Sequence, residues 1–231
     1  MKASIIIPVF NEERTIGEVI DRVIAADLGA LDKEIVVADD GSTDQTCAIA
    51  EARARLHPEW ICVVRAPTNA GKGTAVRMGL ARATGDIFVI QDADLELDPA
   101  DLPLVLGPIV AGNSNVVYGS RFLQRVAYVP AATRLANGFL SLLTNLLFGS
   151  HLSDMETAYK AFRREALHGV VLESNGFEIE PEITAKFLRR GIPIFEVPIR
   201  YAPRTTGQGK KIHWFDGLKA IWALVRYRIA F

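Results

Sequence analysis

Few cysteines, scattered histidines and the lack of a long apolar segment set the first limits on this chain. Its 231 residues include two cysteines, Cys47 and Cys62, whose spacing matches neither a zinc motif nor a redox pair. A disulfide framework is therefore not expected, and a reducing, cytoplasmic setting fits best. The four histidines have no metal-ligand spacing, so we assign them no role.

Sequence signals for secretion and for membrane spanning are missing too. The N-terminal apolar run turns acidic at once and has no small-residue cleavage site, so we expect a mature protein from residue 1. The apolar run at 135–148 is short and is interrupted by Asn137 and Asn145. This favours a buried or interfacial helix over a membrane-spanning one.

Two phosphate-binding motifs are also absent. The stretch NAGKGTA at 69–75 lacks the glycine spacing and the Gly-Lys-Ser/Thr ending of a Walker loop. The stretch PVFNEERTIG at 8–17 lacks the glycine- and arginine-rich triphosphate loop that nucleotidyltransferases typically need. A nucleotidyltransferase is therefore not favoured.

Charge is unevenly distributed, although the net charge is only −1. Residues 1–110 carry 18 acidic and 10 basic side chains, a balance of −8, whereas residues 199–231 carry one acid and seven basic residues, a balance of +6. The two ends of the chain are therefore expected to face different partners. A cationic end suits nucleic acid, an anionic membrane surface or merely a solvated helix.

Short apolar runs alternate with segments of helical spacing in the first half. The segment 16–24 places its apolar side chains on one helix face. Ser42 and Gln45 have capping-box spacing before the next helix. This alternation predicts an α/β fold with a mainly parallel sheet and right-handed crossovers. The expected strands are residues 4–9, 34–38, 60–65 and 86–90.

The second half is less regular. We expect strands at 115–122 and 157–164, helices at 131–148 and 180–190, and an edge strand at 192–201, where prolines mark the margins. We divide the chain into a main domain, residues 1–212, and a C-terminal amphipathic helix, residues 213–231.

Ligands in open parallel sheets bind where the strands end. The loops that leave these ends are residues 8–12, 39–42, 69–73 and 92–96, and three of the four are acidic or glycine-rich. In the last loop, Asp92 and Asp94 flank a single residue and Glu96 follows. Such carboxylates can converge on a hard divalent cation that also takes phosphate and water oxygens. The alternative is a solvated turn before a helix capped by Asp98.

Two other loops offer polar groups. Asp39 and Asp40 precede Gly41 and could accept hydrogen bonds from a nucleobase or a ribose, or could simply form a turn and helix cap. Lys72 follows a glycine at a helix start, which suits the binding of an anion.

The stretches SIIIPVFNEE, VVADDGSTDQT, NAGKGTAVRMGL and DIFVIQDADLE occur in order and at ordinary spacing. Together they resemble the successive motifs of family-2 glycosyltransferases with the GT-A fold. Further along, YGSRF, SDMETAYKAFRR, FEIEPEITAKFLRRG and EVPIRYAPRTTGQGKKI resemble the polyprenyl-phosphate (dolichyl-phosphate) hexosyltransferase branch. The resemblance spans nearly the whole chain and implies a Rossmann-like, mixed and mainly parallel sheet flanked by helices.

The resemblance also implies a nucleotide-sugar donor, an Mg²⁺ or Mn²⁺ ion, a polyprenyl phosphate acceptor and a set of site residues. The donor is expected on Pro8, Phe10, Glu12, Asp40, Lys72, Asp92, Ala93, Asp94, Arg204 and Lys210. The metal is expected on Asp94 and Glu96 with Asp92, and the acceptor phosphate on Arg121 and Arg134. Asp94, Arg121 and Arg204 are the expected catalytic residues. Phe10 stands where relatives often have tyrosine, and Glu96 where they can have glutamine.

The chemistry of the acceptor separates two reactions. A cation with Arg204 and Lys210 would stabilise the departing diphosphate while the acceptor inverts the anomeric carbon. A lipid monophosphate arrives already ionised, by analogy with other phosphomonoesters. A hydroxyl acceptor needs a base, for which Asp154 and Glu156 are the candidates. With a phosphate acceptor these two would instead orient arginines or loops.

The C-terminal helix indicates a lipid partner. Lys219, Arg226 and Arg228 lie off its apolar face, a pattern typical of a helix in an anionic interface. Packing of this face on the domain or on a second subunit is the alternative, and a homo-oligomer is left open. The apolar face consists of Trp214, Leu218, Ile221, Trp222, Val225 and Ile229.

The sequence thus predicts an inverting, metal-dependent hexosyltransferase that is peripheral on the cytoplasmic face of a membrane. The donor is GDP-mannose, UDP-glucose or a related nucleotide sugar, and no nucleic-acid partner is expected. Two alternatives stay open. One is a family-2 transferase acting on a hydroxyl acceptor in polysaccharide or glycan synthesis, and the other is a non-catalytic nucleotide-sugar-binding module.

Overall fold

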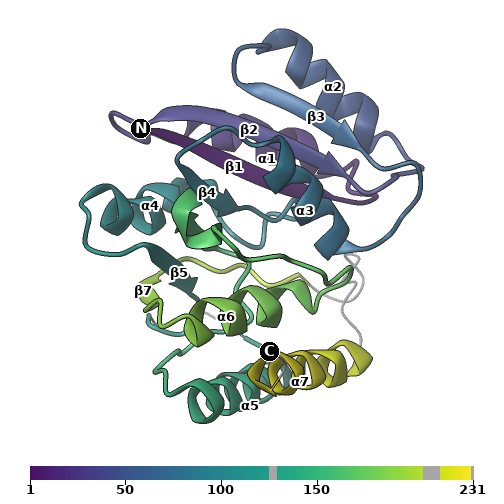
Figure 1. Cartoon of the computed structure of the whole chain (residues 1–231). Helices are drawn as coiled ribbons and strands as arrows, with labels where there is room; N and C mark the ends of the chain where they lie inside the picture. Colours follow the sequence, from purple (N-terminus) through teal and green to yellow (C-terminus); the bar gives the residue numbers. More distant parts are fainter. Residues whose placement is uncertain (125–128, 205–213, 230–231) are drawn as a thin grey trace.

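The computed structural model describes residues 1–124, 129–204 and 214–229. Within them, a single mixed sheet has the strand order β3-β2-β1-β4-β6-β5-β7 (Figure 1). The strands are β1 (Lys2–Val9), β2 (Asp32–Asp39), β3 (Ile61–Arg65), β4 (Ile87–Ile90), β5 (Val116–Ser120), β6 (Lys160–Arg163) and β7 (Phe195–Pro198). The α-helices are α1 (Ile16–Ala25), α2 (Thr46–Leu56), α3 (Lys72–Arg82), α4 (Leu102–Val110), α5 (Ala131–Phe148), α6 (Ile179–Arg189) and α7 (Trp214–Ile229). The predicted α/β class is confirmed.

Strands β1 to β4 form the parallel half of the sheet, with helices on both faces. β1 lies between β2 and β4 and is parallel to both. Alternate residues of a strand point to opposite faces, and Ile5 and Ile7 accordingly pack with α1, whereas Ile6 packs in the cluster that contains residues of α3 and α6. Because these crossovers are parallel, the loops after β1, β2 and β4 reach the same edge of the sheet.

β6 reverses direction within this sheet. It runs antiparallel to both β4 and β5, and Val89 of β4 lies opposite Ala161. The residues that precede β6, including Asp154 and Glu156, therefore arrive at the edge that the residues following β4 also reach. β7 pairs only with β5 among the described strands and is the predicted edge strand.

Helix α7 packs on α5 and α6, but not through the predicted apolar face. Its buried side is formed by Ala220, Ala223, Leu224 and Tyr227. Of the residues predicted to form the apolar face, Ile221 is half-buried, but most of the others are exposed. The exposed members are Leu218, Trp222, Val225 and Ile229, while the side chain of Trp214 lies outside the described part. Packing of the whole stripe on the described domain, the alternative weighed above, is therefore wrong.

Two further expectations concern helix ends and membrane spans. The capping box is wrong: α2 begins at Thr46, its N-cap Gln45 makes no side-chain capping bond, and Ser42 Oγ instead accepts the N–H of Asn11 at 3.0 Å. Ser42 thus ties the loop after β2 to the loop after β1. Among the described helices, none combines the length and apolar character needed to cross a bilayer.

Candidate active site

A cavity of about 850 Å³ lies at the edge of the sheet where β1, β2 and β4 end. The loops that follow these strands line it, together with α3, the segment before β6, the start of α6, and parts of α5 and α7. Eight carboxyl side chains and three basic ones face it among the described residues. The eight are Glu12, Asp40, Asp92, Asp94, Glu96, Glu156, Glu180 and Asp216. Such an excess of negative charge suits a ligand that brings cations with it.

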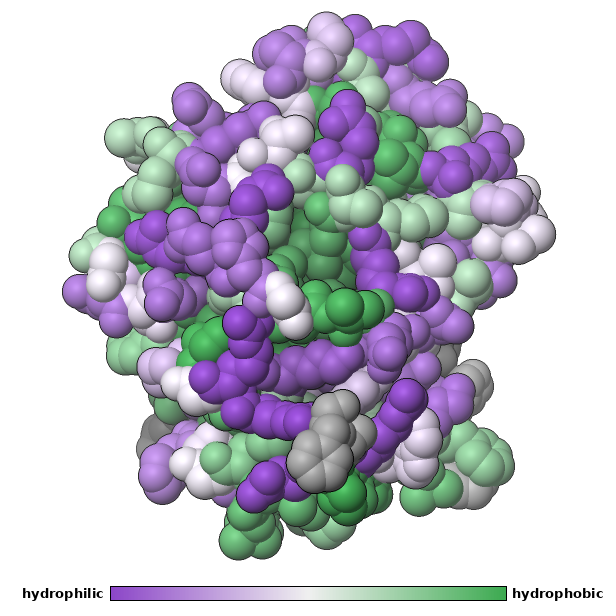
Figure 2. All heavy atoms as spheres, viewed as in Figure 1, coloured by the Kyte–Doolittle hydropathy of each residue, from purple (hydrophilic) through white to green (hydrophobic). Residues whose placement is uncertain are grey.

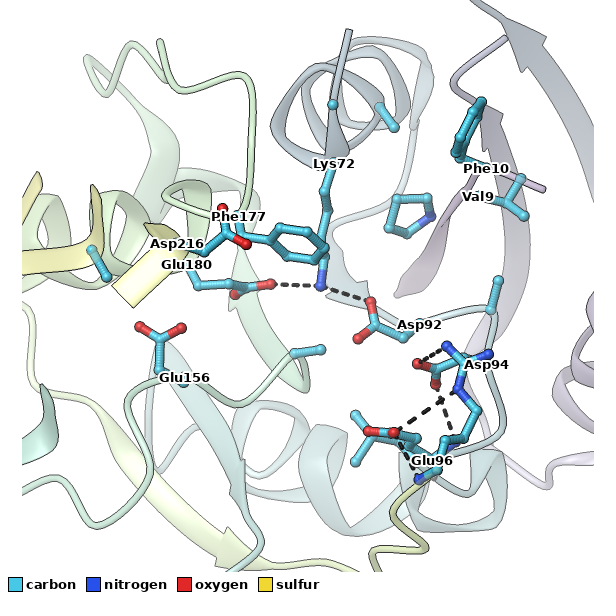
Figure 3. Close-up of a pocket in the computed structure, with 18 of the residues that line it drawn as sticks. Val9, Phe10, Lys72, Asp92, Asp94, Glu96, Glu156, Phe177, Glu180 and Asp216 are labelled. Carbon is cyan, nitrogen blue, oxygen red and sulfur yellow. Dashed lines mark hydrogen bonds and ion pairs between the residues drawn. The ribbon is translucent and has the colours of Figure 1, made fainter. Parts of the chain in front are cut away.

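Arg204 is bound by carboxylates of the loops after β1 and β4. Figure 3 shows two of the carboxylates of the loop after β4, Asp94 and Glu96, close together. Its guanidinium lies 2.8 Å from Asp94 Oδ2 and 3.1 Å from Glu12 Oε2. Its backbone N–H donates to Glu96 Oε1 at 2.9 Å, and Tyr201 donates its hydroxyl proton to the other oxygen of Glu96 at 3.1 Å. The structure therefore brings Glu12, Asp94, Glu96 and Arg204 together, as the sequence predicts, but joins them to one another.

One arginine does not balance this cluster. Burial and the negative charges of Asp92 and Glu96 raise the pKa of Asp94 to about 7, and Arg204 offsets only part of the effect. The site therefore favours additional positive charge. No group of three or more His, Cys, Asp or Glu side chains in the described ranges could hold a metal by itself. Mg²⁺, however, needs only one or two carboxylates when it shares phosphate oxygens, and Asp94 with Glu96 fits that requirement.

The backbone between these two carboxylates is in an uncommon conformation. Leu95 has φ of 62°, in the left-handed region that non-glycine residues rarely adopt. The turn lets the N–H of Glu96 donate to Asp94 Oδ1 at 3.1 Å. A branched residue held in this region indicates a local constraint that the surrounding structure sustains.

Lys72 pairs with two carboxylates at the wall of the cavity. Its Nζ lies 2.7 Å from Asp92 Oδ1 and 2.9 Å from Glu180 Oε1 (Figure 3). Glu180 also pairs with Lys160 at 2.8 Å. Burial alone would lower the pKa of Lys72, but the charges of Asp92 and Glu180 outweigh it and raise the pKa. Lys72 is a fixed cation at the cavity wall, beside the ring of Phe177.

Close backbone packing holds Lys72 in place. Gly73 lies against the loop before α6, where a Cβ atom would come within 2.2 Å of the carbonyl oxygen of Ser174. The N–H of Thr74 donates to the carbonyl oxygen of Asn175 at 3.1 Å. Only glycine allows this approach, so the sequence of the loop determines where the lysine lies.

Replacing Gly73 by Ala is expected to lower the free energy of unfolding by about 1–3 kcal/mol, because the added methyl group forces α3 and the loop apart. Urea unfolding followed by circular dichroism measures the change. Gly107→Ala is the matched control, since a Cβ there meets nothing within 4 Å, and stability should rise by up to about 1 kcal/mol. A Gly73→Ala protein as stable as the wild type would contradict the packing argument.

Asp40 has a partly structural role. Its carboxylate accepts the N–H groups of Ala70 at 3.0 Å and of Gly71 at 2.6 Å, which fixes the loop before α3. Asp40 nevertheless lines the cavity together with Pro8 and Phe10. The expected contact of these residues with a nucleoside stays a prediction, as does any role of Lys210, which lies outside the described residues.

Arg121 and Asp154 form a buried ion pair. The Nε and Nη2 atoms of Arg121 donate to the two oxygens of Asp154, both at 2.7 Å, and the backbone N–H of Arg121 donates to the same carboxylate at 2.9 Å. Burial alone would lower the pKa of Arg121, but the charge of Asp154 outweighs it and raises the pKa. Both carboxylate oxygens are engaged, so Asp154 orients Arg121.

A second cavity of about 450 Å³ adjoins the first. Arg121 and Arg134, the two residues expected at an acceptor phosphate, both line it. Arg121 and Asn137 also line the main cavity, so the two spaces share a wall. Asn137 was missed as a site residue in the sequence, because there it only interrupts an apolar helix.

Glu156 lines the main cavity as well. Its Oε1 atom is shielded from solvent and has no hydrogen-bond partner in the described ranges. Burial raises the pKa of Glu156 to about 7, and the charge of Glu180 adds to this, while Lys160 and Arg121 act in the opposite direction. Glu180, which joins Lys72 to Lys160, was also missed. In the sequence, Glu180 appears only as an acidic residue at the start of a helix. Acidic residues are common there because they interact favourably with the helix dipole, so this position did not indicate a site.

Comparison with known proteins relates this chain to glycosyltransferases. Residues 4–170 match the model of the family described as Glycosyl transferase family 2. The chain is 32% identical to a dolichol-phosphate mannosyltransferase of Pyrococcus furiosus over 98% of its own length and 64% of that protein. It is 29% identical to an undecaprenyl-phosphate 4-deoxy-4-formamido-L-arabinose transferase of an Enterobacter species, over 90% of its length and 62% of the relative. The chain thus spans less than two thirds of both relatives.

A solved structure shares the whole fold. Glucosyl-3-phosphoglycerate synthase from Mycobacterium tuberculosis, crystallised with Mn²⁺ and uridine-diphosphate-glucose, superposes with a TM-score of 0.74 at 27% identity. The superposition covers 98% of this chain and 78% of the synthase.

Proposed function

This chain belongs to glycosyl transferase family 2, and on that basis we propose that it transfers a hexose, with inversion, from a nucleotide sugar to a polyprenyl phosphate. The observation that carries the proposal is the pair of adjoining cavities. One is rich in carboxylates, and the other is lined by Arg121 and Arg134. A donor with its cation suits the first, and an anionic acceptor suits the second. The names of the Pyrococcus and Enterobacter relatives support this acceptor class.

The donor lies along the main cavity in this proposal. Phe10 offers a ring for the base to stack on at the end where β1 finishes. Asp94 and Glu96 would hold Mg²⁺ or Mn²⁺, and the bound ion would neutralise charge that grows on the leaving diphosphate. Lys72 contributes a fixed positive charge beside Asp92. Arg204, which pairs with Asp94 and Glu12 in this structure, exchanges these partners for the diphosphate when the donor enters.

The acceptor phosphate enters from the arginine-lined cavity. Asp154 holds the Arg121 side chain in one orientation. Arg121 therefore loses little conformational freedom when the phosphate binds to it. Because a phosphomonoester is already largely ionised at neutral pH, it attacks without a protein base. Asp154 then has the role of orienting Arg121.

Transfer assays with paired acceptors test the proposal. The protein is incubated with Mn²⁺ and a panel of labelled nucleotide sugars, including UDP-glucose and GDP-mannose, together with undecaprenyl phosphate or undecaprenol. Lipid-linked sugar is expected with the phosphate only. Equal transfer to the alcohol would overturn the phosphate assignment, and tight donor binding without release of nucleoside diphosphate would indicate a binding module.

Transfer to a hydroxyl acceptor is the second candidate function. The raised pKa of Glu156 and its position at the cavity favour it. A carboxyl group with a pKa of about 7 at the wall of the cavity is matched to work as a general base near neutral pH. If this candidate is correct, Glu156→Gln abolishes transfer to undecaprenol while donor binding persists.

We further propose that α5 and α7 place the protein on a membrane, at its cytoplasmic face. Figure 2 shows hydrophobic side chains gathered at the end of the molecule where Figure 1 places these two helices. Both helices line the main cavity, and α5 also lines the arginine-lined cavity, so a lipid-linked phosphate can reach Arg121 and Arg134 while its chain stays in the bilayer. The exposed apolar residues are Leu135, Phe139, Leu142 and Leu146 of α5, and Phe215, Leu218, Trp222, Val225 and Ile229 of α7.

Trp222→Glu is expected to weaken binding to vesicles that contain phosphatidylglycerol by about tenfold, because a large apolar side chain no longer enters the interface. Vesicle co-sedimentation measures the effect. Leu104→Glu is the control, since Leu104 is exposed to a similar degree but lies on α4. Equal losses in both variants, or no loss in Trp222→Glu, would contradict a membrane surface on α7.

A further inference from the structure

Asn137 is buried within α5 with both polar atoms of its side chain unpaired. It is 4% exposed, and neither Oδ1 nor Nδ2 has a hydrogen-bond partner among the residues that the structure describes. Burying an amide without partners destabilises a fold, and the large majority of buried side-chain polar atoms in proteins do have one. Alanine or leucine would suit a helix interior better. The packing of the helix therefore does not explain this residue.

Asn145, the other asparagine in the apolar part of α5, makes the structural hydrogen bonds that Asn137 lacks. Asn145 Oδ1 accepts the N–H of Leu152 and the hydroxyl of Ser150, both at 2.8 Å, and its Nδ2 donates to the carbonyl oxygen of Leu152 at 2.9 Å. These bonds connect the end of α5 to the segment that follows. Asn137 makes no such connection within the described part of the chain, so a bound molecule is the partner to consider.

The surroundings of Asn137 indicate where such partners bind. Asn137 lines the carboxylate-rich cavity together with Leu140, and it lines the arginine-lined cavity together with Arg121 and Arg134. Arg134 lies three residues earlier on α5, so the two side chains are neighbours on the helix. The amide thus lies on the boundary between the space proposed for the donor and the space proposed for the acceptor.

An amide can contact two different groups at such a boundary. Its Nδ2 donates two hydrogen bonds and its Oδ1 accepts them. A phosphate oxygen needs a donor, whereas a sugar hydroxyl can donate to Oδ1. We propose that Asn137 aligns the two substrates, with Nδ2 donating to the acceptor phosphate and Oδ1 accepting from a hydroxyl of the transferred sugar. This inference rests on the proposed function.

Asn137→Leu separates this role from a structural one. Because leucine has a similar size and leaves no unpaired polar atom, the midpoint of urea unfolding is expected to stay unchanged or rise. The value of kcat/KM for transfer to undecaprenyl phosphate should fall about 100-fold, the cost of removing one aligned hydrogen-bond donor at a reacting group. Affinity for UDP or GDP, measured by calorimetry with Mn²⁺, should not change. Asn145→Leu should give the reverse pattern, with lower stability and kcat/KM within about twofold where the protein is folded.

Asn137→Asp tests the contact with phosphate. Aspartate keeps an acceptor oxygen but loses the donor and adds negative charge, so KM for undecaprenyl phosphate should rise more than in Asn137→Leu, while nucleotide-sugar affinity persists. An Asn137→Leu protein that unfolds earlier, as Asn145→Leu does, would assign Asn137 to the fold. Wild-type rates in Asn137→Leu would also overturn the inference. A wild-type protein that transfers to no polyprenyl phosphate overturns the proposed function itself, so the two failures are distinct.

Discussion

Asp94→Asn is expected to lower kcat/KM for sugar transfer by about 10²- to 10³-fold. Asp94 is the carboxylate that pairs most closely with Arg204 in the acidic cluster, and Asn at this position loses the charge that would hold both the arginine and a divalent ion. Steady-state assays with the nucleotide sugar and undecaprenyl phosphate measure the loss. Calorimetric titration of Mn²⁺ in the presence of UDP or GDP should show weaker ion binding in the same variant.

Asp98→Asn is the control for this experiment. Asp98 belongs to the same loop, but its side chain caps the N–H of Ala100 and pairs with Arg200 outside the cavity. Its transfer rate should stay within about twofold of the wild type. Full activity of Asp94→Asn in the presence of EDTA would remove the basis for a cation at the end of β4.

Asp154→Ala is expected to lower the free energy of unfolding by about 3–5 kcal/mol. Asp154 is fully buried and accepts three hydrogen bonds from Arg121, whose own side chain is only 13% exposed. Without the carboxylate, the guanidinium remains buried and uncompensated. Urea unfolding measures the loss, and transfer to undecaprenyl phosphate should fall with it because Arg121 is no longer oriented.

A double variant distinguishes the ion pair from other roles of Asp154. Asp154→Ala combined with Arg121→Met removes both charges, and most of the lost stability should return. Activity with the phosphate acceptor should not return, because the arginine is absent. If the single variant were as stable as the wild type, the pair would have no structural importance.

The parallel half of the fold could be predicted because several independent sequence patterns indicate the same arrangement there. Apolar runs, helical spacing and polar loops at the strand ends all indicate one rim, and the loops around Glu12, Asp40, Lys72 and Asp94 do meet there. The rule that ligands bind where parallel strands end is sufficient for this half.

The same rule does not find Glu156 or Asn137. Glu156 precedes a strand, and it reaches the rim only because β6 runs antiparallel to its neighbours. The direction of a strand depends on pairing between segments more than 70 residues apart, which local spacing does not encode. Asn137 looks like an interruption of an apolar helix until its missing partners are known.

The pattern of charged residues in the sequence also does not predict which ion pairs form in the folded protein. The acidic loop was expected to hold a divalent ion and Arg204 to contact the diphosphate, yet Arg204 and Asp94 pair with each other across 110 residues of sequence. An unliganded protein neutralises its own buried charges where it can, since isolated ones are costly. The resting pairing of Arg204 is thus consistent with its proposed movement to the diphosphate.

The ion pairs of Asp92, Lys72, Glu180 and Lys160 form one unbroken series in which the sign alternates. Lys72 and Glu180 each pair with two oppositely charged neighbours. Replacing one residue of the series by a neutral one would therefore leave a neighbouring charge without its partner in a poorly hydrated wall. We therefore expect these positions to change together in evolution. Among homologues, we expect residue 160 to lose its lysine in the same lineages in which residue 180 loses its carboxylate, a covariation of two distant segments.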